Sequence, residues 1–166
     1  MSAAAFGIAC FLPMIIEAFV SARHERVLGA AGAIEPAGDV YRWMQVAYPG
    51  AFAAMLGEGA LRASPIDTAF AVGCVVFAVA KALKYWAIAA LGERWTFRVL
   101  VPPLAARIQT GPYRWLRHPN YIAVAGELVG AAVAMRAIVT AVPAIGGFVY
   151  LMWRRIQVEE KALGLQ

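Results

Sequence analysis

Charged side chains are scarce in this 166-residue chain: they make up 15% of it, whereas hydrophobic residues make up 62%. A soluble domain of this length is nearer to about one-half apolar and about one-quarter charged. So small a polar complement does not cover the surface of a water-exposed globule. The composition therefore excludes an ordinary soluble domain and indicates an integral membrane protein.

Cysteine is also rare, and Cys10 and Cys74 both lie within apolar runs. A disulfide framework or a metal site needs clustered ligands, so we expect neither a disulfide nor a metal. The two cysteines are interpreted as small buried hydrophobic residues. No basic run alternates with aromatic residues along a polar face, so we expect no nucleic-acid partner.

Five apolar segments approach the length of about 20 residues that a transmembrane helix needs. They cover residues 3–20, 46–61, 66–91, 119–135 and 137–153. The first segment lacks the basic start and the cleavage site of a secretory signal, so we expect it to be a retained helix. The sequence predicts one all-α membrane domain, with a three-span part (1–91) followed by a part that holds a helical hairpin (92–166).

Basic residues predict how this bundle is oriented. Eleven of them fall in three segments, 21–45, 92–118 and the tail from 154, whereas the intervening turns hold only Arg62 and Arg136. Short cytoplasmic loops are enriched in Lys and Arg. We therefore expect the N-terminus outside and the C-terminus in the cytoplasm, in a bacterial inner membrane. The eleven are Arg23, Arg26, Arg42, Arg94, Arg98, Arg107, Arg114, Arg117, Arg154, Arg155 and Lys161.

Five ionisable residues interrupt the apolar segments: Glu17, Glu58, Lys81, Lys84 and Glu127. Such groups are costly in a bilayer and usually face a cavity or a partner. Simpler interpretations exist, because Glu58 could pair with Arg62 and the lysines could extend to the interface. The sequence does not decide whether these five residues serve helix packing or line a pocket.

Two polar clusters flank the last two apolar segments. The hairpin between these segments returns both clusters to the same level. The residues could form a site, or they could be interfacial anchors and a surface ion pair between Arg155 and Glu159. The first cluster comprises Tyr113, Arg114, Arg117, His118, Asn120 and Tyr121, and the second Arg154, Arg155, Glu159 and Glu160.

The stretch GPYRWLRHPNY, then an apolar hairpin, then RRIQVEEKAL resembles the isoprenylcysteine carboxyl methyltransferase family. That family carries R-H-P-x-Y before a helical hairpin and E-E-x-x-L after it; the second motif here runs from Glu159 to Leu163. The resemblance covers roughly residues 92–163. It implies a membrane methyltransferase that uses S-adenosyl-L-methionine.

The resemblance also implies roles for individual residues. Arg155 would contact the substrate, and Arg155 and Glu159 would be catalytic. The segment near 105–108 would belong to the cofactor pocket. The remaining implied cofactor-binding residues are Tyr113, His118, Pro119, Asn120, Tyr121 and Glu159.

The methyl acceptor is less defined, because Ala123 stands where the family often has glycine. The resemblance implies a carboxylate or hydroxyl oxygen on a lipophilic molecule that enters from the bilayer, either prenylcysteine-like or a long-chain polyketide such as an alkylpyrone or alkylresorcinol. The alternatives are a phospholipid N-methyltransferase, an NADPH-dependent membrane reductase and a non-catalytic membrane protein.

Overall fold

The computed structural model describes residues 2–103 and 108–162. Within these residues the chain forms long helices joined by short connections, and Ile34 and Val101 make an isolated antiparallel bridge. The predicted all-α class is confirmed. The elements are α1 (Ala3–Ala30), α2 (Tyr41–Leu61), α3 (Thr68–Leu91), the 3-10 turns η1 (Gly92–Arg94) and η2 (Gly111–Arg114), α4 (Pro119–Met135) and α5 (Ile138–Ala162).

The helices follow the apolar segments but extend beyond some of them. The predicted bounds of α4 are confirmed, whereas α1 continues to Ala30 and α5 to Ala162, well past the predicted ends at 20 and 153. Apolar runs end where side chains meet water, but helical hydrogen bonding continues wherever one face still packs on protein. The extension of α5 therefore places Arg155 and Glu159 on a helix.

Among residues 2–103 and 108–162, two helices are long and apolar enough to cross a membrane by length and composition, Ala3–Ala30 and Thr68–Arg94. The helix Pro119–Met135 is apolar but shorter. The count of five spans and the orientation remain predictions.

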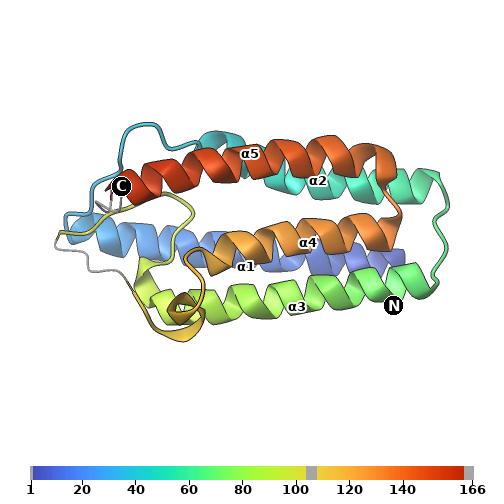
Figure 1. Ribbon diagram of the computed structural model, residues 1–166, viewed down its shortest axis with the longest axis horizontal. Helices are drawn as coiled ribbons and strands as arrows, with labels where there is room; N and C mark the ends of the chain where they lie inside the picture. The colour runs from blue at the N-terminus through green and yellow to red at the C-terminus, as the bar shows by residue number, and fades with distance from the viewer. Residues whose placement is uncertain (1, 104–107, 163–166) are drawn as a thin grey trace.

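The helices lie side by side in a bundle (Figure 1). The N-terminus, the α2–α3 turn and the α4–α5 turn lie at one end. The α1–α2 connection, the segment that follows α3 and the end of α5 gather at the other. This second end, called the loop end below, holds both polar clusters.

Glycine allows α3 and α4 to pack with their backbones nearly in contact. A Cβ atom on Gly73 would lie 2.3 Å from the Ala134 backbone nitrogen, and one on Gly130 would lie 2.6 Å from the Phe77 nitrogen. Small residues give such close approach in membrane helix pairs, where packing drives association. These two helices form the most extensive interface in the bundle.

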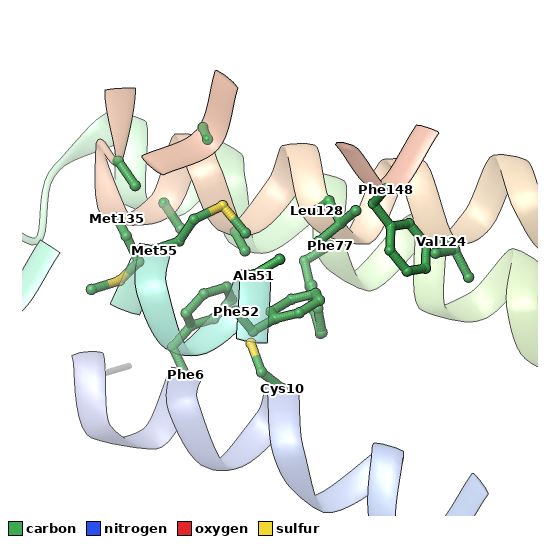
Figure 2. Close-up of a cluster of buried hydrophobic side chains, with 14 of the residues drawn as sticks. Phe6, Cys10, Ala51, Phe52, Met55, Phe77, Val124, Leu128, Met135 and Phe148 are labelled. Atoms are coloured by element: carbon green, nitrogen blue, oxygen red, sulfur yellow. The ribbon is translucent and has the colours of Figure 1, made fainter. Parts of the chain in front are cut away.

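Aromatic rings fill the space between this pair and the other helices (Figure 2). Phe6 meets Phe77 edge-to-face at 5.4 Å between centroids, and Phe52 meets Phe77 at 6.1 Å. Cys10 is fully buried in this core, as expected, whereas Cys74 is partly exposed. Both cysteines are free.

Carboxylates tie the helix ends together opposite the loop end. Glu58 pairs with Arg62 at 3.0 Å, as the sequence suggested, and it also accepts the backbone N–H of Thr140 at 2.8 Å in the first turn of α5. Asp67 accepts the N–H groups of Ala69 and Phe70 at the start of α3, and it pairs with Arg136. The hydrogen bond from Phe70 leads the effects that hold the pKa of Asp67 below its usual value.

Candidate active site

A cavity of about 440 Å³ lies toward the loop end of the bundle. Every long helix lines it, together with the segment that follows α3. Six of the seven residues predicted for the site are among the lining: Tyr113, His118, Asn120, Tyr121, Arg155 and Glu159. The seventh, Pro119, is fully buried outside the lining, at the first position of α4.

The two sequence motifs meet at this cavity. Tyr121, in the first turn of α4, donates a hydrogen bond to Glu159 Oε2 at 3.0 Å near the end of α5. His118 Nε2 donates to Glu160 Oε1 at 3.1 Å. Residues separated by about 40 positions are therefore in direct contact, as the hairpin topology predicted.

The start of α4 has unused hydrogen-bonding capacity. No side chain caps this helix, and Pro119 at its first position has no N–H. The Tyr121 and Ile122 N–H groups both donate to the His118 carbonyl at 3.2 Å. Among the described residues the Asn120 N–H has no backbone partner, and it lies at the partially positive end of the helix. Asn120 Oδ1 is buried without a hydrogen-bond partner. Buried polar atoms are rarely left unpaired in folded proteins, so this atom fits a ligand donor.

Tyr113 reaches the cavity from η2, whose positive-φ residue Gly111 packs so closely that a Cβ would lie 2.8 Å from Ala90. Burial, reinforced by the charge of Glu159, raises the pKa of the Tyr113 phenol. Tyr113 therefore remains a neutral hydrogen-bond donor at physiological pH.

Arg155 does not form the surface ion pair with Glu159 that the sequence left open. Its side chain is 8% exposed, and its Nη1 lies 3.7 Å from Oδ1 of Asp39, just before α2, and 3.9 Å from Sδ of Met44 on α2. Arg114, Arg117 and Arg154 are exposed. Arg155 is therefore placed as a residue of the site, whereas Arg114, Arg117 and Arg154 are placed as expected for interfacial anchors.

Asp39 is a residue that the sequence did not reveal, because it lies in a connection without a motif. Its side chain is 3% exposed beside Arg155. Its Oδ2 accepts the Val99 N–H at 2.9 Å and its Oδ1 accepts the Tyr41 N–H at 3.1 Å. One carboxylate thus links the start of α2, the segment after α3 and the end of α5.

The segment 94–101 forms one wall of the cavity. The Phe97 N–H donates to Ser21 Oγ at 2.7 Å, and His24 Nδ1 donates to the Trp95 carbonyl at 2.8 Å. This aromatic, arginine-containing stretch therefore packs against α1. Of the predicted pocket segment 105–108, residues 105–107 lie outside the described residues, as does Leu163, and Ile108 does not line the cavity.

The lysines inside the bundle do not extend to the interface, so that interpretation was wrong. Lys81 Nζ lies 3.1 Å from Glu17 Oε1 and 3.0 Å from Glu127 Oε2. Lys84 Nζ lies 2.6 Å from Glu17 Oε2 and 3.7 Å from Glu127 Oε2. Tyr48 donates to Glu127 as well. We call Glu17, Lys81, Lys84 and Glu127 the buried tetrad.

The tetrad joins α1, α3 and α4, and its members differ in access to the cavity. Glu17 and Lys84 line it, as does Tyr48, whereas Lys81 and Glu127 lie behind. Two residues that the sequence left undecided are thus pocket lining. Glu58, at the opposite end, serves packing.

The sequence model of the isoprenylcysteine carboxyl methyltransferase (ICMT) family matches residues 71–164, more than half of the chain. The chain belongs to this family. ICMT membership implies an S-adenosylmethionine-dependent methyltransferase of membranes. The matched range contains both motifs and all seven predicted site residues.

Two curated relatives align over most of the ICMT-family chain. The uncharacterized protein YpbQ of Bacillus subtilis is 29% identical over 148 residues, which cover 89% of this chain and 88% of YpbQ. An uncharacterized protein of Haemophilus influenzae is 26% identical over 145 residues, or 87% and 84% of the two chains. No solved structure matches the chain.

The cavity residues fit the cofactor that the ICMT family uses. S-adenosylmethionine carries amino and hydroxyl donors, a carboxylate and an aromatic base. Glu159 and the unpaired Asn120 Oδ1 are acceptors for the donors, and the Asn120 N–H at the start of α4 suits the carboxylate. The rings of Tyr113 and Tyr121 offer apolar surfaces to the base.

Proposed function

We propose that this ICMT-family protein transfers a methyl group from S-adenosylmethionine to a carboxylate or hydroxyl oxygen of a lipophilic acceptor. In this proposal all five helices span a bacterial inner membrane, with the loop end in the cytoplasm. The contact between Tyr121 and Glu159 on one cavity carries the proposal, because it unites the two motifs around unused hydrogen-bonding groups.

Five residues would hold the cofactor at the loop end: Tyr113, His118, Asn120, Tyr121 and Glu159. Pro119 would act from behind by fixing the first turn of α4. When bound, the cofactor supplies an electrophilic methyl group on a positively charged sulfur. Glu160, which accepts from His118, would set the orientation of the imidazole ring.

The acceptor would occupy the remainder of the cavity. Phe11, Met14 and Ile15 of α1, with Met44 and Pro49 of α2, supply an apolar wall for its lipophilic part. That part would enter sideways from the bilayer. Guanidinium groups bind oxyanions through a rigid fork of donors, so Arg155 would orient the oxygen that receives the methyl group.

The wall formed by 94–101 would keep water out of this reaction. Attack of an anionic oxygen on a sulfonium methyl neutralises charge, so a dry site favours the transition state over the separated ions. Alignment of the two reactants in one cavity contributes further.

Calorimetric titration of the detergent-purified protein tests the proposal. We expect binding of S-adenosylhomocysteine and none of NADPH. Glu159→Ala should weaken S-adenosylhomocysteine binding by about tenfold or more, since a hydrogen bond to a charged group contributes about 1.5–3 kcal/mol. The control is Glu93→Ala, which alters an exposed carboxylate outside the cavity lining.

Arg155→Ala should leave the affinity for S-adenosylhomocysteine unchanged, because Arg155 is assigned to the acceptor. Binding of NADPH in place of S-adenosylhomocysteine would show a reductase instead. An unchanged affinity in Glu159→Ala would remove this residue from the cofactor site.

A further inference from the structure

The proposed cofactor site does not use the buried tetrad, although burial of ionised groups is energetically unfavourable. Glu17, Lys84 and Glu127 are each 3% exposed or less. Desolvation of a buried ion is strongly unfavourable, and well-packed apolar residues often replace such networks without loss of stability. Ionisable groups kept inside a membrane bundle usually mark a functional site.

The two lysines of the tetrad are not equivalent. Lys81 Nζ is within hydrogen-bond distance of both Glu17 and Glu127, and it lies outside the cavity lining. Lys84 Nζ is within that distance of Glu17 alone, because Glu127 is 3.7 Å away, and Lys84 lines the cavity. An ammonium has three N–H donors, so Lys84 has donor capacity available where a ligand would lie.

Lys84 lies deeper in the cavity than Arg155. Lys84 Nζ stands 5.2 Å from the centre of the Tyr48 ring, whereas Arg155 contacts Met44, one turn earlier on α2. Residues four apart on a helix are separated by roughly 6 Å. Tyr48 also packs on Phe148 of α5, and Phe148 precedes Arg155 by about 10 Å along that helix. The two cationic groups therefore contact residues one helical turn apart on α2 and lie at different depths in the cavity.

We propose that Lys84, with Glu17 and Tyr48, forms a second polar subsite that binds a hydroxyl or carbonyl oxygen of the acceptor. The inference rests on the proposed function, in which Arg155 binds the methyl-accepting oxygen. The acceptor head group then carries two oxygen functions, one at Arg155 and one deeper at Lys84.

The charges of the tetrad favour a neutral group at this subsite. The two carboxylates of the tetrad balance its two ammonium groups. A second anion would be attracted by Lys84 but repelled by Glu17, whose Oε2 lies 2.6 Å from Lys84 Nζ. A hydroxyl suits both, because it accepts from Lys84 and donates to a free lone pair of Glu17. Two oxygens placed meta on one ring are several ångströms apart, comparable to the rise of one helical turn, roughly 5 Å.

The test compares two amphiphiles that differ by one hydroxyl, 3-dodecyl-5-hydroxybenzoate and 3-dodecylbenzoate. Their affinities are measured by thermophoresis in one detergent, with and without S-adenosylhomocysteine. The wild-type protein should prefer the hydroxylated probe by about tenfold or more, the contribution of one hydrogen bond to a charged group. Each probe partitions into the micelles equally in every sample, so this effect cancels when the ratio of the two affinities is compared between wild type and variants.

The matched variants are Glu127→Gln/Lys84→Met and Glu127→Gln/Lys81→Met, which neutralise the carboxylate that lies outside the cavity lining and keep Glu17. Each removes one carboxylate and one ammonium, so both keep the charge of the tetrad balanced and differ only in which lysine is lost. The first should lose the preference for the hydroxyl and the second should retain at least part of it. No preference in the wild-type protein, an unchanged preference without Lys84, or equal loss in both variants would each overturn the subsite.

The outcomes separate this inference from the proposed function. Binding of S-adenosylhomocysteine without any hydroxyl preference would reject the subsite and retain the methyltransferase. A Lys84-dependent preference in a protein that does not bind S-adenosylhomocysteine would support the subsite as a binding site and reject the methyltransferase on which its role as an acceptor site depends.

Discussion

The close approach of α3 and α4 makes Gly73→Ala a sharp test of the packing. A Cβ on Gly73 would meet three backbone atoms, Ala134 N at 2.3 Å, Ala134 Cα at 2.6 Å and the Gly130 carbonyl oxygen at 2.6 Å. Ordinary contact begins at 3.4 Å, so the helices must separate by about 1 Å. Backbone cannot move aside as a side-chain tip can.

Overpacking of this kind costs about 1–3 kcal/mol, whereas Gly→Ala within a helix returns about 0.5–1 kcal/mol. Because the clash is with backbone, the cost should lie in the upper half of that range, about 2–3 kcal/mol. The net loss of about 1–2.5 kcal/mol corresponds to a Tm lower by roughly 2–10 °C for a chain of this size. Thermal unfolding of the detergent-solubilised protein, followed by far-UV circular dichroism, measures the shift.

Gly146→Ala is the matched control, because Gly146 lies within α5 and a Cβ there would have no neighbour within 4 Å outside its own helix. At this position only the higher helix propensity of alanine acts, so Tm should rise by roughly 1–4 °C. Both substitutions replace glycine with alanine in a helix, yet they should change Tm in opposite directions. A Gly73→Ala protein as stable as the wild type would refute the backbone contact between α3 and α4.

Two further predictions concern the connections at the helix ends. Asp39→Ala should speed amide hydrogen exchange across 95–101 by about tenfold, because the Val99 N–H loses its acceptor. The control Glu35→Ala removes only the partly exposed ion pair with Arg98 and should have less effect. Equal exchange rates in the two variants would contradict the role of Asp39. The stabilisation by Asp67, whose folded pKa is depressed, is present above its unfolded pKa of about 4 and is lost as pH falls through the folded value. The Tm difference between wild type and Asp67→Asn should therefore shrink from pH 6 to pH 3, and a constant difference would contradict it.

The helices and the meeting of the two motifs were predictable because both depend on local signals. The run from Pro119 to Met135 is apolar and starts at a proline, so its predicted bounds are confirmed. A sharp turn at Arg136 then requires α5 to run back along α4, which returns Glu159 to the level of Tyr121. The continuation of α5 past residue 153 was missed because hydropathy falls there while one face of the helix remains packed, as the burial of Arg155 shows.

What the sequence could not show is which distant residues become partners. Asp39 is an ordinary acidic residue until Val99 and Arg155 are placed around it, and those contacts join positions more than 50 residues apart. The same limit applies to Lys81 and Lys84, which are one turn apart on α3 and identical in chemistry. Only the position of Glu127 on α4 separates them, within hydrogen-bond distance of Lys81 and beyond it for Lys84. That difference leaves one lysine structural and gives the other a free donor in the cavity, so the selectivity of the site depends on the register between α3 and α4 that the glycines fix.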